Sequence, residues 1–94
     1  MESSQPIERR SHPRRPVSGQ ITIRQSGAIS ASFVGHLIDL SAMGFRVRHH
    51  CLNLASGQLV HFQWEATHGQ ARTVWTRIVG NEAETGFHIV QRDG

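Results

Sequence analysis

Residues 45–48 read Phe-Arg-Val-Arg and residues 60–64 read Val-His-Phe-Gln-Trp, so apolar and polar side chains alternate along both stretches. A period of two is that of a β-strand, in which successive side chains point to opposite faces of a sheet. The apolar residues of each stretch are therefore expected to face a core, and the polar residues to face water.

The chain from residue 19 onward has the same character, because short apolar or alternating runs are separated by glycines. This punctuation suits an antiparallel all-β domain with little or no helix. Hairpin turns are expected at residues 67–69, Thr-His-Gly, and at Gly80-Asn81. The expected strands are 19–25, 31–39, 44–50, 58–66, 70–79 and 85–91.

The N-terminal residues have a different composition. Residues 1–8 are polar and aperiodic, and we expect them to be disordered. Residues 9–18 form an extended, irregular arm, because Pro13 and Pro16 are incompatible with a helix or a central strand. The 94 residues thus predict one domain, residues 9–94, with a single core in residues 19–92.

Positive charge is carried entirely by arginine: there are ten arginines, no lysine and a formal net charge of +3. Four of them, Arg9, Arg10, Arg14 and Arg15, lie close together in the arm. The arginine fork can grip a phosphate or the O6 and N7 acceptors of guanine. The cluster therefore predicts an anionic partner.

The single cysteine, Cys51, cannot form an intrachain disulfide, and no paired cysteine spacing suggests a zinc site. The start of the chain lacks the apolar stretch of a signal peptide, and no apolar run is long enough to span a bilayer. We expect a cytoplasmic protein that does not interact with membranes.

Two short motifs follow one another along the chain. Residues 10–14 form an R-x-x-x-R motif, and Asp39, Ser41 and Gly44 form a D-x-S-x-x-G motif about 25 residues later. Together they resemble the paired signature of PilZ domains, the cyclic di-GMP receptor family. Further similarity lies at Val17, Ile23, the A-x-x-V-W run of residues 71–75 and Gly86-Phe87, so the resemblance covers about residues 8–92.

This resemblance implies a six-stranded antiparallel split β-barrel. It also implies that cyclic di-GMP binds at one edge of the barrel beneath the folded arm, without a cofactor. The implied ligand-binding residues are Arg10, Arg14, Asp39, Ser41 and Gly44, with Arg9 as an auxiliary contact. Arg46 and Arg48 are candidates for the same face.

The chemistry of the ligand agrees with these residue types. Cyclic di-GMP needs cations for its phosphates, forks for the O6/N7 edge of guanine, and an acceptor for the N1 and N2 donors. Arg10 and Arg14 supply the first two, and the carboxylate of Asp39 supplies the third. Ser41 adds a hydroxyl, and Gly44 permits a positive φ or a close backbone approach. The D-x-S-x-x-G spacing is also ordinary turn chemistry.

The sequence departs from the family pattern at two points. Ile89 replaces the late phenylalanine of the closing strand, which changes packing shape rather than ligand contacts. The sequence also ends without the C-terminal helix that many members carry, so we expect a monomer or a weak dimer. Trp64, Trp75 and Phe87 lie in strand patterns and are expected in the core or at its rim, rather than as a platform on which bases stack.

Other functions remain open. A protein-interaction adaptor with the same fold would not use the nucleotide, although such members usually lack the arginine motif. A general nucleic-acid binder is disfavoured, because residues 1–18 carry +2 and the rest only +1. No catalytic constellation is apparent, and the adjacent His49 and His50 would point to opposite faces, which disfavours a metal site. We expect a receiver that passes its signal to an unidentified protein effector.

Overall fold

A computed structural model describes residues 15–16, 19–26, 31–51 and 54–93 of the chain. No helix occurs in these ranges, as the alternation predicted. The strands are β1 (Arg15–Pro16), β2 (Gln20–Gln25), β3 (Ser32–Leu40), β4 (Gly44–His49), β5 (Leu59–Trp64), β6 (Thr67–Val79) and β7 (Glu82–Asp93).

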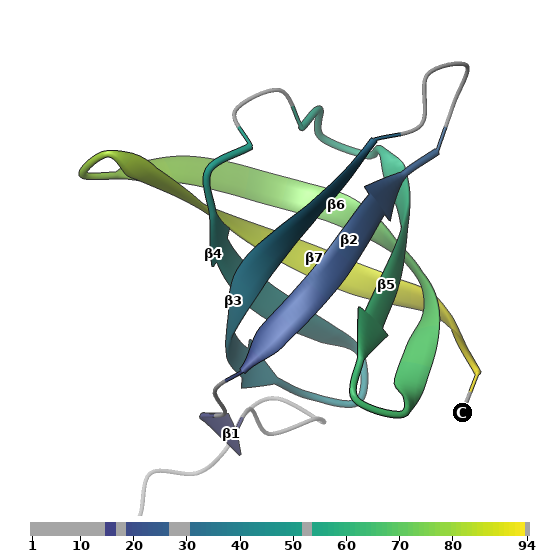
Figure 1. Cartoon of the computed structure of the whole chain (residues 1–94). Helices are drawn as coiled ribbons and strands as arrows, with labels where there is room; N and C mark the ends of the chain where they lie inside the picture. The colour runs from purple at the N-terminus through teal and green to yellow at the C-terminus, as the bar shows by residue number, and fades with distance from the viewer. Residues whose placement is uncertain (1–14, 17–18, 27–30, 52–53, 94) are drawn as a thin grey trace, which may run out of the picture.

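Six of these strands form a closed ring (Figure 1). The order is β3, β2, β5, β6, β7 and β4, every neighbouring pair is antiparallel, and a further pairing of β4 with β3 completes the circle. Closure pairs the backbone groups that an open sheet would leave at its edges. The prediction of a six-stranded antiparallel barrel is confirmed.

Apolar side chains from all six strands fill the barrel. Phe45 lies at the centre of this core, with its ring centroid 5.0 Å from those of both Phe62 and Phe87. Ile89, which replaces the family's late phenylalanine, packs against the cluster from a partly buried position. The buried members are Ile21, Ile23, Leu37, Leu40, Phe45, Val47, Val60, Phe62, Ala71 and Phe87.

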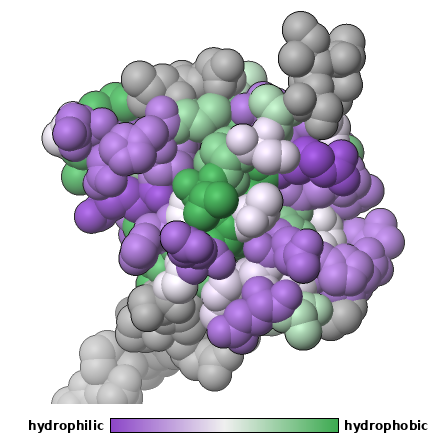
Figure 2. Space-filling model, in the orientation of Figure 1, coloured by the Kyte–Doolittle hydropathy of each residue, from purple (hydrophilic) through white to green (hydrophobic). Residues whose placement is uncertain are grey.

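The outer face is formed by the alternate, mostly polar residues. In β4, Phe45 and Val47 are buried, whereas Arg46 and Arg48 are at least partly exposed. Figure 2 shows that the face of the barrel seen in Figure 1 is mostly hydrophilic, with a small hydrophobic area near its middle. The period-two pattern thus separates the core from the surface as expected.

Removing the aromatic ring of Phe45 should strongly lower the stability of the barrel. We expect Phe45→Ala to destabilise the barrel by about 3 to 5 kcal/mol, because it removes buried contacts and leaves a cavity between two other rings. This is a large share of the roughly 5 to 15 kcal/mol that a small domain has in total. Urea unfolding followed by tryptophan fluorescence would measure the loss. A midpoint equal to that of the parent would contradict the placement of Phe45 at the centre.

The turn predicted at residues 67–69 is wrong. Trp64 pairs with Thr67, so β5 and β6 are joined by the two residues Glu65 and Ala66, and Glu65 has a φ of 54°. Gly69 lies inside β6 instead, where a Cβ would collide with the carbonyl oxygen of Gln91. A glycine at this position allows two strands to approach closely, and it does not form a turn.

The connection between β6 and β7 is as short. Val79 pairs with Glu82 across Gly80-Asn81, and Gly80 has a φ of 66°. The turn expected at Gly80-Asn81 is therefore confirmed, but β7 begins three residues earlier than the expected strand at residue 85.

Two of the three bulges in the described strands change which residues of β3 and β6 face outward. In β3, Leu37 pairs with Val47 and Asp39 with Arg46, so Ile38 is the extra residue. In β6, Thr73 pairs with Phe87 and Trp75 with Gly86, which makes Val74 the extra residue. A bulge shifts the alternation by one position, so each bulge moves the following side chain from the inner to the outer face.

Candidate functional site

Asp39 reaches the outer face of the barrel because of the bulge at Ile38. Regular alternation after the buried Leu37 would have pointed this carboxylate into the core. Asp39 lies opposite Arg46 instead and is still only 5% exposed. A carboxylate this buried needs charged or hydrogen-bonding partners.

Arg46 is one of those partners. Its Nε donates a hydrogen bond of 2.7 Å to Oδ2 of Asp39, and its Nη2 lies 2.5 Å from the same oxygen. The hydrogen bond to Asp39 is the main reason that the pKa of Arg46 is raised. Arg46 therefore lies on the same face of the barrel as Asp39.

Ser41 and Gly44 lie together in the turn between β3 and β4. The backbone amides of Met43 and Gly44 donate to the Ser41 hydroxyl at 3.3 and 3.2 Å, and the Ser41 amide donates to the Gly44 carbonyl at 2.8 Å. Ser41 therefore shapes the turn, as the ordinary chemistry of this motif predicts. Positive φ angles among the described glycines occur at Gly19, Gly57 and Gly80 and not at Gly44.

The short strand β1 brings the end of the arm to this turn. Arg15 pairs with Leu40 and Pro16 with Asp39, on the part of β3 that β2 does not cover. A proline is tolerated here because β1 pairs with a single strand. The backbone that directly follows the R-x-x-x-R motif thus lies against the strand that carries Asp39.

Three residues that the sequence did not predict as ligand contacts extend the site across β7 and β6. Glu84 is only 2% exposed and accepts a hydrogen bond of 2.7 Å from Nε of Arg77. Arg77 lies 5.8 Å from the ring of Trp75, within cation–π range. On its other side, Glu84 lies 3.8 Å from Nη1 of Arg46. The charges along the outer face therefore alternate from Asp39 to Arg77.

Trp75 is the aromatic residue of this face. It is 38% exposed, at the rim rather than in the core, and its indole covers Gly86, where a Cβ would lie 2.5 Å from the ring. A hollow of about 160 Å³ lies beside it. The residues lining this hollow are Met43, Gly44, Val74, Trp75, Gly86, Phe87 and His88.

The family model of the PilZ domain matches residues 8–93 of the chain. The chain belongs to the PilZ domain family. PilZ domains form a family of cyclic di-GMP receptors, which are binding modules. A search of curated proteins found no match to the chain.

The structure describes some of the expected ligand-binding residues and not others. Asp39, Ser41 and Gly44 lie in one turn and the strand before it, next to Arg46. Arg9, Arg10 and Arg14 lie outside the described residues, as does the segment of residues 1–8 expected to be disordered. Arg48 lies further along β4, with its Nε 3.9 Å from Glu82.

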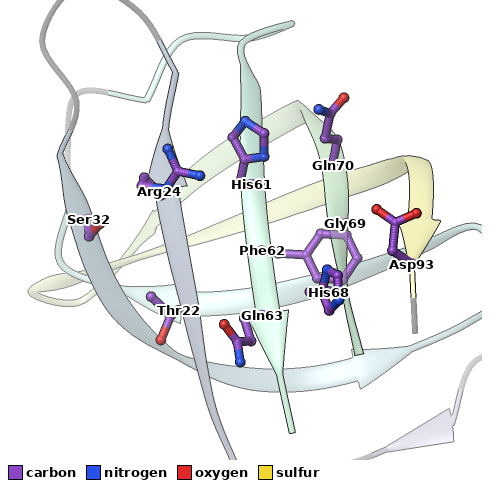
Figure 3. Close-up of a pocket in the computed structure, with 10 residues that line it drawn as sticks. All are labelled: Thr22, Arg24, Ser32, His61, Phe62, Gln63, His68, Gly69, Gln70 and Asp93. Carbon is purple, nitrogen blue, oxygen red and sulfur yellow. The ribbon is translucent and has the colours of Figure 1, made fainter. Parts of the chain in front are cut away.

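Away from the PilZ motifs, a larger hollow of about 580 Å³ lies over β2, β5 and β6 (Figure 3). None of the expected ligand-binding residues lines it. Its lining residues are Thr22, Arg24, Ser32, His61, Phe62, Gln63, His68, Gly69, Gln70 and Asp93.

His49 and His50 point to different surroundings, as the alternation predicted. His49 is 2% exposed; its Nδ1 accepts a hydrogen bond from the Cys51 amide, and its Nε2 lies 2.7 Å from the Thr85 hydroxyl. His50 is exposed and lies 3.2 Å from Glu82. No group of three or more histidine, cysteine or acidic residues within the described ranges is placed to hold a metal ion. The same ranges contain no helix that could cross a membrane.

The buried His49 predicts a dependence of stability on pH. Burial, and secondarily the charge of His50, lowers the pKa of His49 from its usual 6.5. The unfolded chain therefore takes up this proton more readily, and the stability present above pH 6.5 is lost as the pH falls below it. We expect the melting temperature of the parent to decrease between about pH 7 and pH 5.

Two single variants separate the contributions of His49 and His50 to the pH dependence of the melting temperature. His49→Gln should flatten the decrease, whereas His50→Gln, at the exposed neighbouring position, should largely keep it. Melting curves followed by circular dichroism at several pH values would measure both. A full pH dependence in His49→Gln would show that another group is responsible.

Proposed function

We propose that this PilZ domain is a cytoplasmic receiver module that binds cyclic di-GMP between its arginine arm and the β3–β4 turn. The observation that carries the proposal is the pairing of β1 with β3. Arg15, which directly follows the R-x-x-x-R motif in the sequence, pairs with Leu40 of the D-x-S-x-x-G motif.

The charges on the barrel surface indicate that the phosphates of the ligand are bound by the arm and not by the barrel. Two carboxylates, Asp39 and Glu84, lie beside two guanidinium groups, Arg46 and Arg77, so these four groups have no net charge. The two negative phosphates of the ligand therefore need cations from elsewhere. Arg10 and Arg14 of the arm supply them, with Arg9 as an auxiliary contact.

The barrel offers the bases of the ligand a hydrogen-bond acceptor and a stacking surface. Asp39 accepts the N1 and N2 donors of one guanine, while an arm arginine contacts its O6/N7 edge. The face of Trp75, beside the hollow at Gly44 and Gly86, offers a surface on which a base stacks. The Ser41 hydroxyl holds the turn in the shape that presents these groups.

Isothermal titration calorimetry with cyclic di-GMP tests the proposal. We expect saturable binding of moderate affinity, because ordering the arm costs about 1 to 2 kcal/mol per residue in backbone entropy. The titration also gives the stoichiometry. Absence of binding at concentrations far above the micromolar range would contradict the receiver function.

A ligand-dependent arm would explain how a module without catalytic groups passes on a signal. We expect the arm, residues 1 to about 16, to be mobile without nucleotide except where Arg15 and Pro16 pair with β3, and ordered over the barrel with nucleotide. The reason is that four neighbouring arginines repel one another until phosphates neutralise them. Ordering changes the surface that a protein effector meets. Hydrogen exchange should show new protection in the arm on saturation; an arm equally protected in both states would contradict this switch.

The adaptor alternative has one observation in its favour. Asp39 and Ser41 already have partners within the barrel, namely Arg46 and the turn amides. An adaptor of PilZ fold would keep these contacts for stability and bind its protein partner, as a monomer or weak dimer, whether or not cyclic di-GMP is present. The calorimetric titration separates the two functions.

A further inference from the structure

A row of four charged side chains crosses the outer face of β3, β4, β7 and β6 beside the proposed nucleotide site. Asp39 contacts Arg46, Arg46 approaches Glu84, and Glu84 contacts Arg77. We propose that Arg46 is a positioning residue, which orients the Asp39 carboxylate for base recognition and is itself held by Glu84. The inference rests on the proposed binding of cyclic di-GMP.

The register of the strands sets up the contact. Asp39 and Arg46 are direct cross-strand partners, and they are so only because Ile38 is extruded from the pairing. Nε and Nη2 of Arg46 both approach Oδ2, at 2.7 and 2.5 Å, rather than forking over the two oxygens. Arg46 therefore holds the carboxylate of Asp39 through two donors on one of its oxygens.

Glu84 holds Arg46 from the other direction. Its side chain is 3% exposed, and one of its oxygens, Oε2, lies 3.8 Å from Nη1 of Arg46, while Oε1 contacts Arg77. A buried carboxylate keeps its cationic partners close, because each lost partner leaves charge without compensation. The guanidinium of Arg46 is thus placed between two buried acids and has little freedom to turn away.

The consequence for binding concerns specificity more than affinity. Without Arg46, the Asp39 carboxylate would lose a two-donor partner, and with it the orientation that accepts two donors from guanine. Cyclic di-GMP would lose this recognition, whereas cyclic di-AMP, which cannot offer the N1 donor, would lose little. The preference for guanine should therefore shrink.

Arg48 provides a matched control. It lies on the same strand, also on the outer face, and its side chain is 44% exposed with its nearest described acid, Glu82, at 3.9 Å. Arg48→Gln removes the same charge as Arg46→Gln, so both reduce the general attraction of phosphates. Only Arg46→Gln removes a contact to Asp39.

The test is a pair of calorimetric titrations, with cyclic di-GMP and cyclic di-AMP, on the parent, Arg46→Gln, Arg46→Lys and Arg48→Gln. We expect Arg46→Gln to reduce the ratio of the two affinities by about tenfold or more, in keeping with a lost charge-assisted bond. Arg46→Lys should give an intermediate ratio, because lysine restores the charge but not the two-donor geometry. Arg48→Gln should keep the ratio of the parent.

Each other result has a defined meaning. Equal ratios in Arg46→Gln and Arg48→Gln would overturn the positioning role while the proposed function stands. A parent that binds neither nucleotide would overturn the proposed function, and this inference with it. If Arg46→Gln melts below the assay temperature, Arg46→Lys decides: a ratio equal to that of the parent overturns the inference, and a reduced one supports it.

Discussion

Replacing Arg10 and Arg14 together by alanine is expected to abolish measurable binding of cyclic di-GMP. Each arginine makes charge-assisted hydrogen bonds worth about 1.5 to 3 kcal/mol, or roughly ten- to hundredfold in affinity. The four charged groups on the barrel side, Asp39, Arg46, Glu84 and Arg77, have no net charge, so they cannot replace the lost cations. Calorimetric titration of the variant would measure the effect.

The control for this variant must lose the same charge. Arg24 and Arg92 are exposed on the barrel, away from the turn, and Arg24 lines the hollow of Figure 3. The double alanine variant at these positions should bind nearly as the parent does, and both double variants should keep the parent's melting temperature. Tight binding by the Arg10/Arg14 variant would contradict the role of the arm.

The second large effect concerns the base. We expect the domain to prefer cyclic di-GMP over cyclic di-AMP by at least tens-fold, because adenine places an amine donor where guanine has O6 and offers Asp39 no N1 donor. Each unpaired buried group costs about 1 to 3 kcal/mol. A competition titration measures the ratio directly.

An Asp39→Asn variant locates the source of this preference. The amide is nearly isosteric with the carboxylate but presents a donor as well as an acceptor, so the preference should fall strongly while the backbone pairing of β3 with β4 is retained. Equal affinities of the parent for the two nucleotides would remove Asp39 as the residue that recognises guanine.

The barrel could be predicted from sequence because its core follows a local rule. Alternation in residues 45–48 and 60–64 placed the apolar side chains inward, and the structure confirms this with Phe45, Val47 and Val60 almost fully buried. The ends of the strands were predicted less accurately than the core. The turn at Glu65-Ala66 lacks glycine and proline, so its composition gives no signal.

The candidate site was predictable only in part. Asp39, Ser41 and Gly44 lie within six residues, so their proximity follows from chain connectivity. The bulges at Ile38 and Val74 are not visible in the sequence, because they depend on which strand pairs alongside. Without the second bulge, alternation would place Trp75 inside the barrel. For the same reason the contacts of Glu84, made across strands, could not be foreseen.

The central claim is that the nucleotide binds between the arm and the β3–β4 turn, and amide chemical shifts measured during a titration with cyclic di-GMP test it most directly. We predict that the shift changes concentrate in residues 9–16 and 39–46, with His61 and Gln70 of the hollow in Figure 3 unaffected. Changes confined to that hollow, or none at saturating nucleotide, would contradict the claim.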